Sequence, residues 1–521
     1  MEEAASILPL SSKLDAITDS LGLFLPEFSI AATFILVLVA GLLIRKDNRK
    51  GLPHIILPLI TMAGIATAAC FLLAQWQQVG QEVDIFLGMA RADRLSVYVR
   101  GLFLLATAGT VIINRSYSRH QEHAARSPEF YLIITGLLLG AMVMSMAVNL
   151  LLLFLSIEIV SVSAYILTGF LRSPKSAEAG IKYLIFGATA SALMLFGMSL
   201  LYGFSGSLAF TQGQFIQNLA EVPAMPLAIG GLLVLVGLFF KISLVPVHIW
   251  APDVYEGAPL PAVTLFSIVP KLAGLVVLLR FYTVLVHTGV SLPQIQWQEI
   301  LAVAGIATLI VGNLAALWQN SARRLMAYSS IAHGGFMLAG LLAFTDTGVE
   351  SLLFYATVYC LMNLAAFEWL AYFEKRYGIQ QVGEFAGLFR QEPLAAICLL
   401  ITMIALTGLP PTAGFTAKLL VFGALWDSYG STGHTAILIF LLTGIFTTIA
   451  ALFYYLKIPY FLFFRNPERE IPAMPSEMDK ISRRGLWAGT ILTIPLLIFF
   501  VKADWLSDVI RMVNYVLQIP G

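Results

Sequence analysis

Three lysines and one glutamate stand inside long apolar runs of this sequence, where an ionised side chain is costly. Lys241, Lys271 and Lys418 lie well within such runs, and so does Glu158. A charge at the centre of a membrane-spanning helix costs about 2.5–3.5 kcal/mol, so it usually faces a partner or water and marks an ion or proton pathway. A lysine beside a carboxylate can be held near the point at which it gains or loses a proton. We therefore predict proton transfer, with Glu158 as the counter-ion of Lys241.

Two of these lysines lie beside prolines that interrupt a helix. Lys241 is followed by Pro246, and Lys418 follows Pro410 and Pro411. Proline removes a backbone donor and clashes with the preceding turn, which leaves free carbonyls at membrane depth. Interrupted helices at corresponding places in two halves are typical of transporters built from repeats. We predict such repeats, with an ion site at each break, although the halves show no clear identity residue by residue.

Further polar residues could extend a proton relay, and each has a structural alternative. His248 follows Lys241 by seven residues, nearly two helical turns, which predicts that both lie on one face. Lys182 stands one turn after Glu178 and could simply pair with it at the membrane edge. His248 and His333 could instead be hydrogen-bonded packing residues.

Four other charged residues fall within the apolar runs. Arg100, Arg280 and Lys457 lie close enough to predicted helix ends for their charged groups to reach the membrane surface. Glu368 is either a second acidic member of the relay or a residue of the cytoplasmic rim, and the sequence leaves both readings open.

The composition of the chain is that of a membrane protein. Of its 521 residues 59% are hydrophobic and 12% charged, with a mean hydropathy of +0.85, whereas soluble domains have about 25% charged residues. The formal net charge of +1 gives no basic field to attract nucleic acid. Cys70, Cys360 and Cys398 lack the spacing of metal, iron–sulfur or disulfide sites, and no glycine-rich nucleotide motif occurs. We expect no metal and no cofactor in this chain.

The apolar runs predict an all-α polytopic membrane protein. A span needs about 20 mostly apolar residues, and with that length the sequence contains about fourteen transmembrane helices. The predicted spans are 25–45, 53–75, 95–114, 129–147, 149–171, 180–203, 226–247, 260–286, 298–318, 324–344, 351–373, 394–424, 434–463 and 485–504.

Basic residues alternate between the two sides of the predicted bundle. The loops after the first, third, fifth, ninth, eleventh and thirteenth spans are rich in lysine and arginine, whereas the opposite loops contain only Arg91 and Arg94. Basic loops remain cytoplasmic. We therefore predict a multi-pass protein of the cell inner (plasma) membrane with both termini on the non-cytoplasmic side.

The motifs around these residues resemble the antiporter-like subunits of respiratory complex I. The similarity includes Glu158 and the run 241–259, Lys-Ile-Ser-Leu-Val-Pro-Val-His-Ile-Trp-Ala-Pro-Asp-Val-Tyr-Glu-Gly-Ala-Pro. It also includes 323–333, Arg-Arg-Leu-Met-Ala-Tyr-Ser-Ser-Ile-Ala-His, and 409–418, Leu-Pro-Pro-Thr-Ala-Gly-Phe-Thr-Ala-Lys. The lysine of the last motif and the short segment after the last span resemble the subunit N branch of bacterial NADH:quinone oxidoreductase.

The resemblance implies two inverted five-helix repeats, each with a broken helix. Residues 1–127 would hold three spans, 128–290 the first repeat with spans 4–8, 291–465 the second with spans 9–13, and 466–521 a loop, span 14 and a short tail.

The same resemblance implies roles for individual residues. Glu158 and Lys241 would form the charged pair, Lys271 would continue the central axis, and Lys418 would lie at the exit half-channel. Lys182 and His248 would occupy polar positions of the same family.

The function implied is that of a non-redox, proton-translocating subunit coupled to quinone reduction elsewhere in its complex. NADH, flavin, iron–sulfur clusters and quinone would be bound by other subunits. Sibling antiporter-like subunits, other membrane-arm subunits and lipids would be the neighbours. A subunit of a multi-subunit cation/proton antiporter, or of a membrane-bound energy-converting hydrogenase, remains an alternative.

Overall fold

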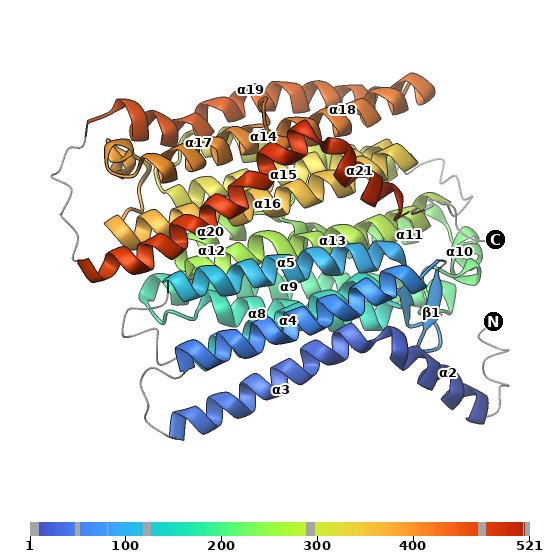
Figure 1. Cartoon of the computed structure of the whole chain (residues 1–521). Coiled ribbons are helices and arrows are strands. Elements are labelled where there is room, and N and C mark those ends of the chain that lie inside the picture. Colours follow the sequence, from blue (N-terminus) through green and yellow to red (C-terminus); the bar gives the residue numbers. More distant parts are fainter. Residues whose placement is uncertain are drawn as a thin grey trace.

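The computed structural model describes residues 10–46, 53–80, 82–117, 127–287, 297–466, 476–513 and 515. Long helices run side by side through the molecule, and the first half of the chain lies next to the second (Figure 1). The first-half elements are α2 (Leu10–Leu23), α3 (Leu25–Lys46), α4 (Pro53–Gln78), β1 (Val83–Ile85), β2 (Ala90–Ala92), α5 (Arg94–Tyr117), α7 (Ser127–Met146), α8 (Leu150–Thr168), α9 (Pro174–Ser205), α10 (Gly213–Ala220), α11 (Ala224–Ile242), α12 (Trp250–Gly257) and α13 (Leu260–His287).

The second half is also helical. Its elements are α14 (Trp297–Leu317), α15 (Ala322–Ala343), α16 (Asp346–Tyr377), the short 3-10 turns η1 (Val382–Phe385) and η2 (Leu388–Arg390), α17 (Pro393–Thr407), α18 (Ala413–Thr432), α19 (Thr435–Phe464), α20 (Ser476–Val501) and α21 (Ala503–Arg511).

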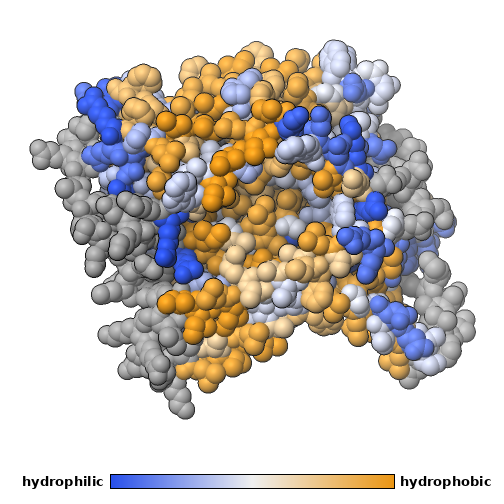
Figure 2. Space-filling view, viewed as in Figure 1, coloured by the Kyte–Doolittle hydropathy of each residue, from blue (hydrophilic) through white to orange (hydrophobic). Residues whose placement is uncertain are grey.

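The helix count agrees with the predicted spans. Within the described residues, thirteen helices are long and apolar enough to cross a membrane. The remaining predicted span, 394–424, is divided between the short apolar helix α17 and the first part of α18. Apolar side chains cover the middle of the visible face and hydrophilic ones gather towards the ends of the helices (Figure 2). The prediction of an all-α polytopic membrane protein is confirmed.

Three helices form the centre of the bundle. Every residue of the most apolar window of α13 is buried, as are 94% of those in α15 and α16, against 33% in α3 and 22% in α20. Only helices satisfy their own backbone polar groups in such an apolar interior. The central helices therefore place any polar side chain they carry far from solvent, and they carry Lys271, His333 and Glu368.

Both predicted helix breaks are present. In the first, α11 ends at Ile242 and α12 begins at Trp250, with a cis Val245–Pro246 peptide between them. The break starts before the proline, at Ser243, whose φ of 62° is left-handed. The backbone N–H of Val245 donates to Thr308 Oγ1 on α14 at 3.0 Å, so a freed group finds a partner on another helix.

The second break separates α17 from α18 and contains the cis Pro410–Pro411 peptide. Gly414 lets α18 approach the end of α17, because a Cβ at this position would lie 1.8 Å from the carbonyl oxygen of Ala405. Only glycine permits so close a contact between the two half-helices.

The prediction that Arg100 and Arg280 extend to the membrane surface is wrong. Arg100 is 0% exposed and donates to Glu27 at 2.7 Å, joining α5 to α3. Arg280 is 3% exposed and pairs with Asp93 at 2.8 Å, joining α13 to the start of α5. Neighbouring helices surround both positions, which leaves the guanidinium groups no route outward.

Candidate functional site

Lys271 is buried where four helices meet. Its side chain on α13 is 1% exposed, and Nζ donates to the carbonyl oxygen and, at 2.7 Å, to the hydroxyl of Ser330 on α15. The Ser330 hydroxyl also lies 2.9 Å from the Tyr255 hydroxyl on α12 and 2.8 Å from that of Tyr359 on α16. One serine therefore connects the buried ammonium group to two tyrosines that can accept or donate protons.

His333 forms the next polar group, one helical turn further along α15. Its Nδ1 lies 2.7 Å from the Tyr355 hydroxyl, and its Nε2 lies 3.1 Å from the Tyr455 hydroxyl on α19. Tyr455 also contacts the Ser329 hydroxyl. With both ring nitrogens hydrogen-bonded, this imidazole can take a proton on one side and release one on the other.

Lys418 belongs to the half-helix α18, and its side chain reaches back to the C-terminal end of α17. Its side chain is 4% exposed, and Nζ donates to the carbonyl of Thr407 at 2.9 Å and to Thr448 Oγ1 at 3.3 Å. Thr407 is the last residue of α17, so the ammonium group meets unpaired carbonyls and the negative end of the helix dipole.

Lys241 lies at the other break but on the helix that precedes it, in the last turn of α11. It is 5% exposed and its Nζ donates to the hydroxyl of Ser161 on α8. Glu158 lies one turn away on α8, close enough for the two charges to interact, but its buried Oε1 has no hydrogen-bond partner. The predicted counter-ion is thus nearby, and a serine makes the direct contact.

Lys241 and Lys271 belong to helices that pack closely. A Cβ at Gly274 on α13 would lie 3.2 Å from Lys241 Cβ. Gly274 is three residues after Lys271, so the small residue brings α11 to within one turn of the second lysine. Glycine here positions the two ammonium groups relative to each other.

An aromatic ring separates the polar groups at His333 and Lys418. The Phe336 ring lies 4.2 Å from Lys418 Nζ and 6.3 Å, centroid to centroid, from the His333 ring. An aromatic ring neither accepts nor carries a proton, so transfer past Phe336 requires water.

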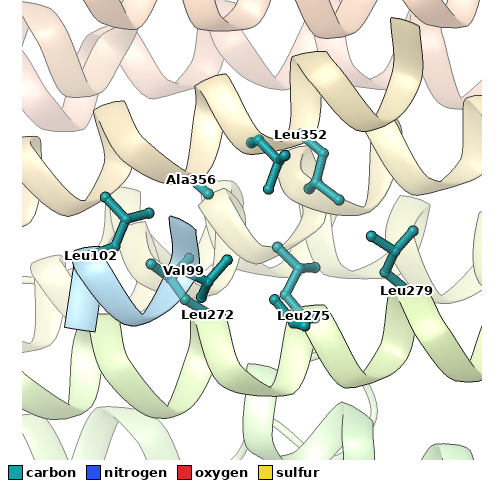
Figure 3. A pocket seen from close by; sticks show the side chains of 9 residues that line it. Val99, Leu102, Leu272, Leu275, Leu279, Leu352 and Ala356 are labelled. Atoms are coloured by element: carbon teal, nitrogen blue, oxygen red, sulfur yellow. The ribbon is translucent and has the colours of Figure 1, made fainter. Parts of the chain in front are cut away.

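A small apolar cavity lies beside the relay (Figure 3). Its walls come from α5, α13 and α16, and include Val99, Leu272, Leu275, Leu352 and Ala356. A cavity without polar lining stays dry. The leucines of α13 that line it thus present an apolar surface towards α5 and α16.

Lys182 is a surface residue rather than a buried one. Its side chain is 42% exposed, and Nζ donates to Glu178 at 2.8 Å and to Asp253 on α12 at 2.8 Å. Arg324 on α15 also donates to Asp253 at 2.8 Å. The pairing with Glu178 that the sequence suggested is present, and Asp253 extends it to three helices.

The prediction that His248 shares a helix face with Lys241 is wrong, because α11 ends at Ile242 and helical spacing does not continue past it. His248 is half-buried in the connection to α12, and its Nδ1 lacks a hydrogen-bond partner.

Comparisons with known proteins assign the chain to a family. A family described as "NADH:quinone oxidoreductase/Mrp antiporter, TM" matches residues 147–447, more than half of the chain. The matched region holds Glu158, Lys241, Lys271 and Lys418. This chain belongs to that antiporter family. The resemblance in the sequence motifs is confirmed.

Curated members of the antiporter family match nearly the whole chain. "NADH-quinone oxidoreductase subunit N 2" of Chloroherpeton thalassium is 34% identical over 90% of this chain and 90% of its own length. "NAD(P)H-quinone oxidoreductase subunit 2" of Microcystis aeruginosa is 36% identical over 91% and 90%. Among solved structures, respiratory complex I from Thermus thermophilus contains a chain with a TM-score of 0.72 and 29% identity, covering 95% of this chain and 100% of that one.

Several residues of the site were not identified from the sequence of this antiporter-family chain. Ser330, Tyr255 and Asp253 lie within two of the three motifs that carried the resemblance, and this position was the signal that could have identified them. Ser161 and Tyr359 stand in ordinary apolar helices. Serine and tyrosine are common packing residues in such helices, and only the contacts with the lysines distinguish these two.

Substituting Ser330→Ala is expected to lower coupled turnover of the complex roughly tenfold, because a hydrogen bond to a charged group contributes about 1.5–3 kcal/mol. Quinone reduction and proton translocation in sealed vesicles measure the effect. Ser351→Ala on α16 is the matched control, since that buried hydroxyl contacts only Gly348 of its own helix. Equal activity of the Ser330→Ala and Ser351→Ala variants would show that Ser330 takes no part in proton transfer.

Substituting Lys182→Ala is expected to change proton translocation less than about twofold, because half-exposed ion pairs contribute about 0–1 kcal/mol. The proton-relay role of Lys182 implied by the resemblance stays a prediction. A loss of proton translocation as large as that expected for a buried lysine would show that Lys182 takes part in proton transfer.

Proposed function

We propose that this chain is the antiporter-like subunit N of an NADH:quinone oxidoreductase and translocates protons through Glu158, Lys241, Lys271, His333 and Lys418. The observation that carries the proposal is the row of buried polar groups on the central helices. Hydrogen bonds join Lys271, Ser330 and Tyr359, and the His333 ring, which is bonded to Tyr355, lies 5.3 Å from the Tyr359 ring, centroid to centroid. Buried cations of this kind mark ion pathways, because membrane insertion opposes them.

Proton movement would proceed by short steps between these groups. A proton released by the Lys241 ammonium when Glu158 moves away would pass by water to Lys271, whose contact with Ser330 leads to Tyr359 and Tyr255. His333 would pass it on, and Lys418 would receive it once water bridges the Phe336 ring. Repulsion between neighbouring loaded lysines would favour release of the outermost proton.

We place the chain in a multi-subunit membrane complex, because the relatives named above are subunits of such assemblies. Sibling antiporter-like subunits and lipids would contact its exposed apolar faces. The chain itself would bind no metal or redox cofactor. NADH, flavin, iron–sulfur clusters and quinone would belong to other subunits. The basic loops support an inner-membrane location with both termini outside the cytoplasm.

The test is to purify the complex with this chain and reconstitute it in sealed vesicles. We expect NADH-driven quinone reduction to generate a pH gradient that a protonophore abolishes. Cation/proton exchange without electron transfer would favour the antiporter alternative. Hydrogen-dependent turnover would favour the hydrogenase alternative.

A further inference from the structure

Glu368 is a buried carboxyl that the relay does not use. It lies on the central helix α16 with 1% of its side chain exposed, and its Oε2 has no hydrogen-bond partner. Within the described ranges it takes part in no ion pair. The charged group whose field reaches it is Lys375, about two turns along the same helix.

An unpaired carboxylate in such surroundings is strongly disfavoured relative to the neutral acid. Two arrangements reduce that cost, a nearby cation or hydrogen-bond donors, and Oε2 has neither within contact distance. These surroundings therefore favour the neutral acid over the carboxylate.

The carboxyl faces the last long helix, α20, which packs directly against α16 (Figure 1). A Cβ at Gly485 of α20 would lie 3.3 Å from Glu368 Oε1 and 3.3 Å from Tyr372 Cδ2. Gly485 therefore lets the α20 backbone pack directly against Glu368 and against Tyr372, which lies one turn further along α16. Ionisation of Glu368 would place a charge against this apolar contact.

A route from the acid to the rim of the protein would follow the same face of α16, and its first step, from Glu368 to Tyr372 one turn on, would need a bridging water. The Tyr372 hydroxyl donates to Glu392 Oε2 at 3.0 Å, and Glu392 pairs with Arg376 at 2.6 Å. The Glu392 and Arg376 side chains are 12% and 18% exposed, so this cluster reaches solvent. It lies at the basic, predicted cytoplasmic end of α16.

Glu368 and the relay share a helix but lie on opposite sides of it. Tyr359, which contacts Ser330, precedes Glu368 by nine residues, or two and a half turns. The proton on Glu368 is therefore held outside the Lys271–His333 path.

We propose that Glu368 is a second proton-binding site, loaded from the Glu392 end, whose proton leaves only when α20 separates from α16 or admits water. The step is a simple protonation, in which one carboxylate oxygen accepts a proton delivered through the Tyr372–Glu392 cluster.

Infrared spectra of the purified complex in H₂O and D₂O test the proposal without turnover, and so independently of the proposed function. We expect a carbonyl band of a protonated carboxylic acid that shifts in D₂O and is missing in Glu368→Gln. Glu350→Gln is the matched control, because Glu350 lies on the same helix with its side chain 42% exposed. A spectrum of Glu368→Gln identical to the wild type would overturn the proposal.

Tyr372→Phe tests the loading route. It keeps the aromatic ring against Gly485 and removes the hydroxyl that contacts Glu392. The band of Glu368 should remain, while its hydrogen–deuterium exchange should slow about tenfold, the factor that corresponds to one lost hydrogen bond. Unchanged exchange in this variant would overturn loading through Glu392.

Discussion

Lys241→Ala is expected to reduce proton translocation by the assembled complex at least about tenfold, since a positioned acid–base group contributes roughly a hundredfold or more. The lysine is buried at the end of α11, contacts Ser161 and lies near Glu158. Alanine leaves that acid without a cation, so it would remain neutral and could not drive the proton on. Quinone-reductase activity and the pH change in sealed membranes measure the loss, once assembly has been checked.

Lys457→Ala is the matched control for this experiment. Lys457 is also a lysine of a long apolar helix, but its Nζ donates to the Gln319 carbonyl at 3.0 Å and to Asn320 Oδ1 at 3.2 Å, near the end of α19. We expect the complex with the Lys457→Ala substitution to keep most of its quinone-reductase activity and proton translocation. Undiminished turnover and pumping by the Lys241 variant would mean that the buried lysine is structural and that the relay starts elsewhere.

Arg100→Met is expected to destabilise the protein by about 3–5 kcal/mol, the cost of leaving one partner of a buried ion pair alone. Arg100 and Glu27 are both 0% exposed, and Arg100 also donates to Gln75 at 3.0 Å, so one guanidinium holds α3, α4 and α5 together. Thermal unfolding of the purified complex, and the yield of assembled complex, report this loss.

The double variant Arg100→Met with Glu27→Leu separates pairing from packing. Replacing both members of a buried pair with apolar residues is often neutral or stabilising. We therefore expect the double variant to be clearly more stable than Arg100→Met alone. If the two variants unfold at the same temperature, the damage comes from lost packing around Arg100 rather than from the unpaired carboxyl.

Hydropathy and proline placement predicted the class of fold, the spans and both helix breaks. These features depend on short stretches of chain, because a helix must be long and apolar enough to cross the membrane on its own. The same reasoning selected Lys241, Lys271 and Lys418, which are all buried. Their relay roles, the repeat boundaries and the roles of Glu158, Lys182 and His248 stay predictions.

Helical spacing gave a wrong prediction where it was extended beyond a helix end. The alignment of His248 with Lys241 assumed an unbroken helix, whereas α11 ends at Ile242. Proximity to a helix end likewise suggested exposure of Arg100 and Arg280, although the surrounding helices bury both.

The depth of a residue in the membrane was thus determined by the sequence itself, since it follows from the position of that residue within one helix. The partner of each buried charge was decided only by the tertiary structure. Lys271 and Ser330 are 59 residues apart in the chain, and Glu27 and Arg100 are 73 apart. Contacts over such separations depend on how whole helices pack, and small residues such as Gly274 and Gly414 set how closely they can approach. No local pattern encodes that packing, so the lysines could be found in the sequence but their acceptors could not.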